Sequence, residues 1–194
     1  MPAAVDSFVT IVSGLPRSGT SMMMRMLEAG GIPVITDGIR EADEDNPGGY
    51  YEFEAVKQKD GEHPWLATAN GKSVKMIYRL LYALPGTHQY RVLFMRRKIE
   101  EVLASQKKML ERNGKAGDNP ITDDQMAAMF RSQLSKFETW VAEQPNFHLI
   151  DVDYNAMLAD PMPQIAKIDA FLGGGLNTQA MAEVVNPSLY RNRA

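Results

Sequence analysis

The sequence predicts an α/β fold of three layers, in which helices flank a mainly parallel central sheet. Short apolar runs rich in β-branched residues alternate along the chain with longer helical segments, as in proteins built from parallel strands and crossover helices. The first such run, "SFVTIVSG", leads directly into a glycine-containing turn and then into a helical segment. The chain has 194 residues and contains no linker, repeat or low-complexity tract, so we expect a single domain over 1–194.

The composition excludes several classes of protein. The net charge of −3 disfavours a large nucleic-acid interface. The absence of cysteine excludes disulfides, cysteine-bound zinc and thiol catalysis. The N-terminus lacks the features of a signal peptide, and no apolar run approaches the ~20 residues of a membrane span. We therefore expect a soluble, cytoplasmic protein without nucleic-acid partners, while its oligomeric state stays open.

The first half of the chain predicts two strands and a helix around the turn. The β-branched run at 7–14 is typical of a buried parallel strand. The segment at 20–31, "TSMMMRMLEAGG", predicts a helix that stops at its glycine pair, and its methionines favour core packing. We expect a short strand at 32–36, a long polar loop at 37–54 and a short helix at 53–61.

The second half continues the alternation. "KSVKMIY" and "YRVLFMRR" predict strands, joined by "RLLYALPGTHQ". "IEEVLASQKKMLERNG" predicts a helix that ends at Gly114, and Thr122 or Asp123 caps a further helix over about 124–144. "NFHLIDVD" predicts the last strand, "DPMPQIAKIDAFLGGG" predicts a helix that ends near Gly173, and the tail is irregular.

The turn after the first strand, "GLPRSGTS" at 14–21, predicts an anion-binding loop of a P-loop-like fold. Backbone N–H groups and the dipole of a helix N-terminus attract anions, and glycines allow close approach. The spacing follows the Walker pattern, but Thr20 stands where that pattern has lysine, and Arg17 supplies the loop's positive charge. A nucleoside triphosphate with Mg²⁺ normally requires that lysine. A less charged group, such as a sulfuryl group, suits the loop better.

The stretch "LPRSGTSMMMRML" resembles the 5′-phosphosulfate loop of the sulfotransferases that use 3′-phosphoadenosine 5′-phosphosulfate (PAPS), in the arginine version found in bacterial and protein-tyrosine enzymes. The resemblance implies that PAPS is the co-substrate and that no metal is required. The residues that it implies for the 5′-phosphosulfate are Gly14, Pro16, Arg17, Ser18, Gly19, Thr20 and Ser21.

Two further stretches resemble the same family, and the three together span residues 8 to 173. "FMRRKIEEVLAS" resembles its 3′-phosphate motif, which assigns Arg97 and Ser105 to that phosphate, with Arg96 as the alternative if the register differs by one. "LIDVDYNAMLADPMPQIAKIDAFLGG" resembles a segment in which Tyr154 falls on a tyrosine that lies near the adenine in relatives.

The sequence also departs from the family pattern. Lys75 matches a family lysine, but Ile77 occupies the position of the catalytic histidine of cytosolic members. The remaining histidines, His63, His88 and His148, lie elsewhere, and we expect ordinary structural roles for His88 and His148.

A carboxylate should therefore serve as the base. Asp37 ranks first and Glu52 second among the acidic residues of the 37–54 loop. The family's C-terminal basic element is missing; Arg191 and Arg193 are candidate substitutes, and a frayed basic tail is the equal alternative.

The resemblance implies a sulfotransferase that acts on a hydroxyl or amine of a small-molecule, carbohydrate or lipid acceptor. Arg17 and Lys75 would stabilise the charge that develops during transfer. Two alternatives stay open. One is a P-loop small-molecule kinase or nucleotide hydrolase, for which Asp151 and Asp153 are weak Mg²⁺ candidates; the other is a non-catalytic nucleotide-binding protein.

Overall fold

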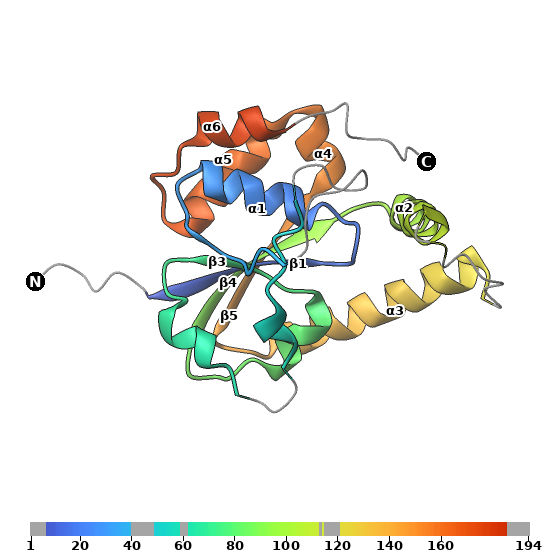
Figure 1. Ribbon diagram of the computed structural model, residues 1–194, viewed down its shortest axis with the longest axis horizontal. Coiled ribbons are helices and arrows are strands. Elements are labelled where there is room, and N and C mark those ends of the chain that lie inside the picture. The colour runs from blue at the N-terminus through green and yellow to red at the C-terminus, as the bar shows by residue number, and fades with distance from the viewer. Residues whose placement is uncertain (1–6, 40–48, 59–61, 113, 115–120, 186–194) are drawn as a thin grey trace, which may run out of the picture.

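A computed structural model describes residues 7–39, 49–58, 62–112, 114 and 121–185, and Figure 1 shows the arrangement of its elements. The strands are β1 (Phe8–Gly14), β2 (Val34–Ile35), β3 (Ser73–Lys75), β4 (Gln89–Arg96) and β5 (Phe147–Asp153). The α-helices are α1 (Thr20–Ala29), α2 (Ile99–Arg112), α3 (Asp123–Ala142), α4 (Tyr154–Ala159), α5 (Pro161–Leu172) and α6 (Thr178–Val184). Three 3₁₀ helices also form: η1 (Glu54–Lys57), η2 (Pro64–Thr68) and η3 (Tyr78–Ala83).

The five strands form one parallel sheet in the order β2-β3-β1-β4-β5. β1 lies in the centre, where Thr10 pairs with Ser73 of β3 and with Arg91 of β4. Its side chains are buried on both faces, as the continuous β-branched run predicted. The predicted three-layer α/β fold is confirmed.

Helices cover both faces of the sheet (Figure 1). On one face α1, α4, α5 and α6 pack over Val12, Leu93 and Val152. On the other face α3 and the 3₁₀ helices pack over Ile11 and Val92. Ile11 and Val12, successive residues of β1, therefore point to opposite faces of the sheet and pack in two separate apolar cores. The four methionines of α1 are all buried in the first of these, as predicted: Met22, Met23, Met24 and Met26.

Several local predictions were wrong in extent. The strand expected over "KSVKMIY" stops at Lys75, because the backbone turns into η3 at Tyr78. The helix expected at 53–61 is only the short η1 within the described residues, and α6 was not predicted at all. The cap of α3 was predicted well: the Thr122 side chain accepts a hydrogen bond from the Gln125 backbone, and the Gln125 side chain accepts one from the Thr122 backbone.

Parallel pairing places the carboxyl ends of all strands at one edge of the sheet. The loop after β1, the residues after β3 and β4, and the start of α4 after β5 therefore converge there. This is the edge at which open α/β sheets bind ligands. Among the described residues, no helix has the length and apolar character needed to cross a membrane.

Candidate active site

The loop between β1 and α1 requires both of its glycines. Gly14 has φ 145° and Gly19 has φ 99°, in the region that favours glycine. A Cβ atom on Gly19 would lie 2.3 Å from Cδ2 of Tyr154, and one on Gly14 would lie 2.6 Å from Oγ of Ser18. The glycines therefore fix both the turn and its close packing against α4.

Arg17 sits at the centre of this loop in a strained conformation. Its φ of 72° is left-handed, which is uncommon for a residue with a side chain. Its Nε donates a hydrogen bond to Ser105 Oγ at 3.0 Å, and its carbonyl accepts one from Arg97 Nη1 at 3.0 Å. The fold thus brings together the residues assigned to the two ends of the donor, although 80 and 88 positions separate them.

The Ser18 hydroxyl is buried without a hydrogen-bond partner among the described residues. A buried polar group of this kind carries the full cost of its lost hydration. Ser18 lies inside the loop, whereas Pro16 is exposed and Thr20 begins α1. An anion oxygen bound in the loop would satisfy the Ser18 hydroxyl.

Arg97, rather than Arg96, faces the loop. Its guanidinium lies 4.7 Å from the ring centroid of Tyr154, and its Nε contacts Glu101 at 2.9 Å. Tyr154 is buried against Gly19 and Arg97, and burial raises the pKa of its hydroxyl. Its assignment to the adenine stays a prediction.

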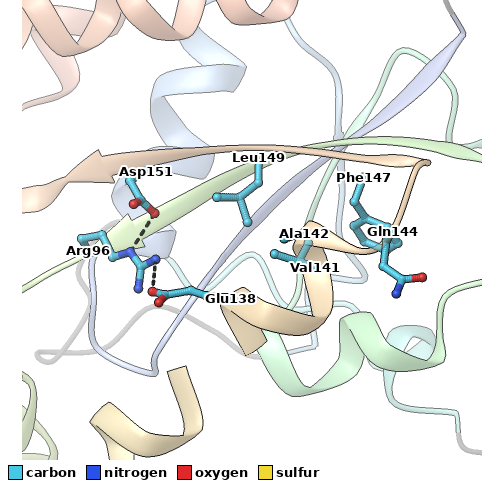
Figure 2. Close-up of a pocket in the computed structure, with 8 residues that line it drawn as sticks. All are labelled: Arg96, Glu138, Val141, Ala142, Gln144, Phe147, Leu149 and Asp151. Carbon is cyan, nitrogen blue, oxygen red and sulfur yellow. Dashed lines mark hydrogen bonds and ion pairs between the residues drawn. The ribbon is translucent and has the colours of Figure 1, made fainter. Parts of the chain in front are cut away.

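Arg96 points to the opposite face of the sheet. Figure 2 shows its guanidinium between Asp151 at 2.7 Å and Glu138 of α3 at 2.6 Å. These residues line a groove of about 480 Å³ that includes no residue of the loop at 14–21. Arg96, the alternative residue for the 3′-phosphate, therefore forms its ion pairs with Asp151 and Glu138, away from the loop.

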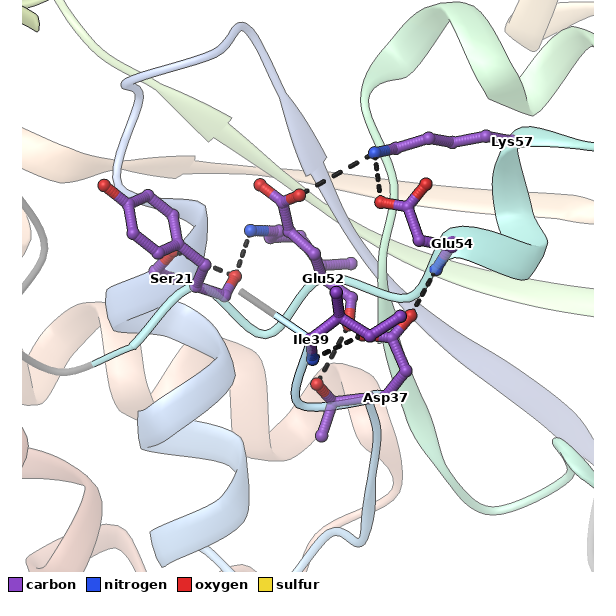
Figure 3. A network of polar contacts seen from close by, with 9 residues as sticks. Ser21, Asp37, Ile39, Glu52, Glu54 and Lys57 are labelled. Atoms are coloured by element: carbon purple, nitrogen blue, oxygen red, sulfur yellow. Dashed lines mark hydrogen bonds and ion pairs between the residues drawn. The ribbon is translucent and has the colours of Figure 1, made fainter. Parts of the chain in front are cut away.

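Lys75 and Ser21 meet at the backbone of Tyr50. Lys75 Nζ donates a hydrogen bond to the Tyr50 carbonyl, and Ser21 Oγ donates to the same oxygen at 3.3 Å (Figure 3). The next residue, Tyr51, has φ 52°, and its hydroxyl donates to Glu28 at 2.6 Å. Burial and this hydrogen bond raise the pKa of Tyr51 to about 12. Residues 50–52 thus lie directly beside the anion-binding loop.

The two candidate bases have different surroundings (Figure 3). Both carboxylate oxygens of Asp37 accept backbone N–H bonds, from Glu54 at 2.6 Å and Ile39 at 3.1 Å. The amide of Glu54, and then that of Ile39, lowers the pKa of Asp37. Glu52 is half-buried, and its carboxylate lies 3.7 Å from Lys57 Nζ.

Asp151 and Asp153, the candidate Mg²⁺ ligands, lie among the described residues, whereas Arg191 and Arg193 do not. Asp151 pairs with Arg96, and Asp153 caps α4 by accepting the Ala156 N–H at 2.9 Å. The remaining acidic residues of the 40–48 stretch, together with Arg191 and Arg193, lie outside the described residues.

The structure places the histidines and Ile77, the residue in the histidine position of the family pattern, as follows. Ile77 is 43% exposed and follows Lys75 by two positions. The ring of His63 is buried and contacts the Ala83 carbonyl at 3.0 Å, while His148 lies exposed on β5. His88 contacts Thr87 at 3.0 Å.

The sequence analysis missed two residues that the fold adds to this site. Glu101 is fully buried, and Asn155 donates to both of its carboxylate oxygens at 3.0 and 3.2 Å. The available signal was the i,i+4 spacing of Arg97 and Glu101, which favours an ion pair on a helix. The spacing does not predict that Glu101 is buried.

The fold and its glycine-bounded loop define an α/β protein of the P-loop-like type, with its ligand edge at the carboxyl ends of the strands. The sequence profile of the sulfotransferase family matches residues 49–177, more than half of the chain. That region contains Lys75, Arg97, Ser105 and Tyr154 and begins after the loop. The chain belongs to the sulfotransferase family.

Solved structures share the fold over nearly the whole chain. The sulfotransferase STF1 of Mycobacterium tuberculosis is 20% identical with a TM-score of 0.60, over 91% of this chain and 71% of that one. Mouse sulfotransferase SULT7A1, complexed with PAP, is 16% identical with a TM-score of 0.56, over 96% and 68%. The sulfotransferase domain of the curacin biosynthetic pathway is 16% identical with a TM-score of 0.51, over 92% and 78%. No curated protein sequence matches the chain.

Proposed function

We propose that this sulfotransferase uses PAPS as donor and transfers its sulfuryl group to a hydroxyl or amine of a small-molecule, carbohydrate or lipid acceptor. The observation that carries the proposal is the convergence of Arg17, Arg97 and Ser105 on one loop. Two guanidinium groups beside a loop of backbone amides suit a ligand with more than one anionic group, because guanidinium forks match phosphate and sulfate oxygens. The PAP complex of mouse SULT7A1 is consistent with such a ligand.

In the proposed reaction the acceptor atom attacks sulfur in line. The bond between sulfur and the bridging oxygen breaks, the acceptor takes the sulfuryl group, and adenosine 3′,5′-bisphosphate leaves. Arg17 and Lys75 would stabilise the negative charge that grows on the bridging oxygen and the sulfuryl oxygens. The Ser18 and Ser21 hydroxyls and the amides of the loop would hold the 5′-phosphosulfate, and Arg97 and Ser105 the 3′-phosphate.

For the proton, we place Glu52 ahead of Asp37 as the base. Two backbone N–H groups already occupy the oxygens of Asp37 and lower its pKa, which weakens it as a base. Glu52 lies two residues from the carbonyl that contacts Lys75 and Ser21, so its carboxylate belongs to the segment beside the loop. Ile77 would offer the acceptor an apolar contact in place of an imidazole.

Calorimetry with three nucleotides tests the donor. We expect adenosine 3′,5′-bisphosphate to bind more tightly than adenosine 5′-monophosphate, without Mg²⁺, because Arg97 and Ser105 are assigned to the extra phosphate. ATP with Mg²⁺ should bind more weakly than the bisphosphate, since Thr20 replaces the lysine of a Walker loop. Tight binding of ATP only in the presence of Mg²⁺ would instead favour the kinase or hydrolase alternative.

The base is tested by Asp37→Asn and Glu52→Gln, which keep shape and remove basicity. Activity is measured as bisphosphate release from PAPS with 2-naphthol, an alkylamine and a monosaccharide as acceptor probes. Glu52→Gln should lose a factor on the order of 10²–10⁴ in turnover and keep its donor affinity. The reverse pattern identifies Asp37 as the base. Full activity of both variants, with bisphosphate binding intact in the wild type, rejects a carboxylate base.

A further inference from the structure

A buried ion pair between Arg97 and Glu101 contacts the anion-binding loop. Glu101 of α2 is fully buried, and the side chain of Arg97 is 7% exposed; their Oε2 and Nε atoms lie 2.9 Å apart. Asn155 of α4 donates to both oxygens of Glu101, so the carboxylate joins two helices. Buried ion pairs of this kind are weak contributors to stability and can often be replaced by apolar side chains. Stability alone therefore gives little reason for this pair.

The pair reaches the loop through Arg97. Arg97 Nη1 donates to the carbonyl of Arg17, the residue with the left-handed backbone, at 3.0 Å. The guanidinium also covers the ring of Tyr154, which packs against the backbone of Gly19. Strained backbone conformations persist only where the surroundings hold them. Arg97 supplies such a hold on the Arg17 peptide, and Glu101 fixes the direction of Arg97.

We propose that Glu101 is a positioning residue for sulfuryl transfer: through Arg97 it sets the backbone of Arg17 and thereby the shape of the loop that receives the 5′-phosphosulfate. The inference rests on the proposed function. It differs from a role confined to the 3′-phosphate, because it makes the 5′ end of the donor depend on Glu101 and Arg97 as well. The contact between Arg17 Nε and Ser105 extends the same coupling to α2.

The test is Glu101→Gln, with adenosine 5′-phosphosulfate as the probe. This nucleotide carries the 5′-phosphosulfate and lacks the 3′-phosphate, so it reports on the loop alone. Residues that orient a ligand-binding group from behind, as at metal sites, are typically worth about 10- to 100-fold. We expect a loss of that order in the affinity for adenosine 5′-phosphosulfate, and a shifted Arg17 Nε–H resonance in arginine-labelled protein.

Glu100→Gln is the matched control. Glu100 is the neighbouring carboxylate on α2, pairs with Arg131 at 2.7 Å, and is more than half exposed. It should leave both the affinity and the resonance unchanged. If Glu101→Gln weakens adenosine 3′,5′-bisphosphate and leaves adenosine 5′-phosphosulfate unaffected, Arg97 acts on the 3′-phosphate alone and the inference is overturned.

A second variant covers the case in which Glu101→Gln does not fold, since it leaves Arg97 buried without its counter-charge. The double variant Arg97→Met, Glu101→Met removes both charges together and should fold. It should still bind adenosine 5′-phosphosulfate about 10- to 100-fold more weakly than the wild type. Wild-type affinity in the double variant would overturn the inference. If the wild type binds neither nucleotide, the proposed function fails and the inference with it.

Discussion

Gly19 controls how the loop packs against α4. Its positive φ and the ring of Tyr154 beside it leave no room for a side chain. The same ring is covered on another side by Arg97. One missing Cβ atom thus allows the loop, α4 and the end of β4 to meet.

Gly19→Ala should therefore destabilise the protein by more than backbone strain alone. Strain at a left-handed position costs on the order of 1–3 kcal/mol, and displacing the Tyr154 ring adds to it. Gly71→Ala is the matched control, because Gly71 has φ 71° and no atom within 4 Å of the added Cβ. Denaturant unfolding should rank Gly19→Ala below Gly71→Ala in stability. Equal losses would show that the Tyr154 contact does not matter.

Arg17 is the residue from which we expect the largest effect on turnover. In the proposed reaction its partner charge grows in the transition state, so Arg17→Ala should lower kcat by about 10²–10³-fold, the usual effect of removing one preorganised donor. Bisphosphate release with the three acceptor probes measures the effect. Arg131→Ala, on the exposed face of α3, is the control for removal of a positive charge. A normal kcat with a raised KM for PAPS would assign Arg17 to ground-state binding instead.

Asp37 should contribute pH-dependent stability. Its folded-state pKa is lowered, so the contribution is present above the unfolded value of 3.8 and is lost as pH falls through the lower folded value. Asp37→Asn should therefore be less stable than the wild type at neutral pH, and the difference should shrink below about pH 4. Urea unfolding across this range checks the sign. A difference that grows in acid would contradict the lowered pKa.

At the scale of elements, the positions of α2 and α3 decide which side chains reach the site. α2 carries Glu101 and Ser105 on its buried face, one helical turn apart, so one helix serves both Arg97 and Arg17. α3 packs on the face of the sheet that carries Ile11 and Val92, where its Glu138 pairs with Arg96. Arg96, the last residue of β4, and Arg97, the first residue after it, thus contact different elements.

The start of α3 is held by its capping box. Thr122→Ala removes the side-chain acceptor for the Gln125 N–H and should cost about 1 kcal/mol in the free energy of unfolding. Thr139→Ala is a useful comparison, because Thr139 lies in the last turn of α3, far from the cap, and its hydroxyl donates back to the Ser135 carbonyl. There the better helix propensity of alanine should leave stability unchanged or slightly raised. Similar losses at both positions would argue against a specific role for the cap.

For the molecule as a whole, the site joins segments from both halves of the chain across the carboxyl edge of one sheet. The loop follows β1, Lys75 ends β3, Arg97 follows β4 and Tyr154 follows β5. We expect these elements to unfold together, as small single domains usually do, so a ligand bound there should stabilise the entire fold. The family match begins only at residue 49, yet the site requires the loop that precedes it.

Adenosine 3′,5′-bisphosphate should accordingly raise the unfolding temperature. At 100 times its dissociation constant a ligand stabilises the folded state by about 2.7 kcal/mol. We expect the same shift with Mg²⁺ and with a chelator, because the proposed chemistry uses no metal. A thermal-shift titration measures both, and a shift abolished by the chelator would contradict metal-independent binding.

The sequence by itself determined the alternation of the strands with the main helices, the loop and the fold class. These depend on local features: a β-branched run makes a buried strand, and glycines at 14 and 19 permit one kind of turn before a helix. Strand ends and the short segments after β3 were less predictable. Lys75 is followed by a 3₁₀ helix rather than more strand, because residues from η3 pack on Phe137 of α3, far away in the sequence.

Only the tertiary structure decided which side chains of the candidate site meet. The sequence favoured Arg97 by its spacing to Ser105 and left Arg96 as the alternative; in the fold Arg96, the last residue of β4, pairs with Glu138 of α3, and Arg97, which follows the strand, contacts the loop. Asp37 and Glu52 are both acidic loop residues, and the backbone amides of Glu54 and Ile39 distinguish them. In the sequence Glu101 resembles an exposed residue of a helix, but in the fold it is buried and contacts Arg97 and Asn155. Burial, and contacts between residues 80 positions apart, arise only when the chain folds, so the local sequence pattern cannot predict them.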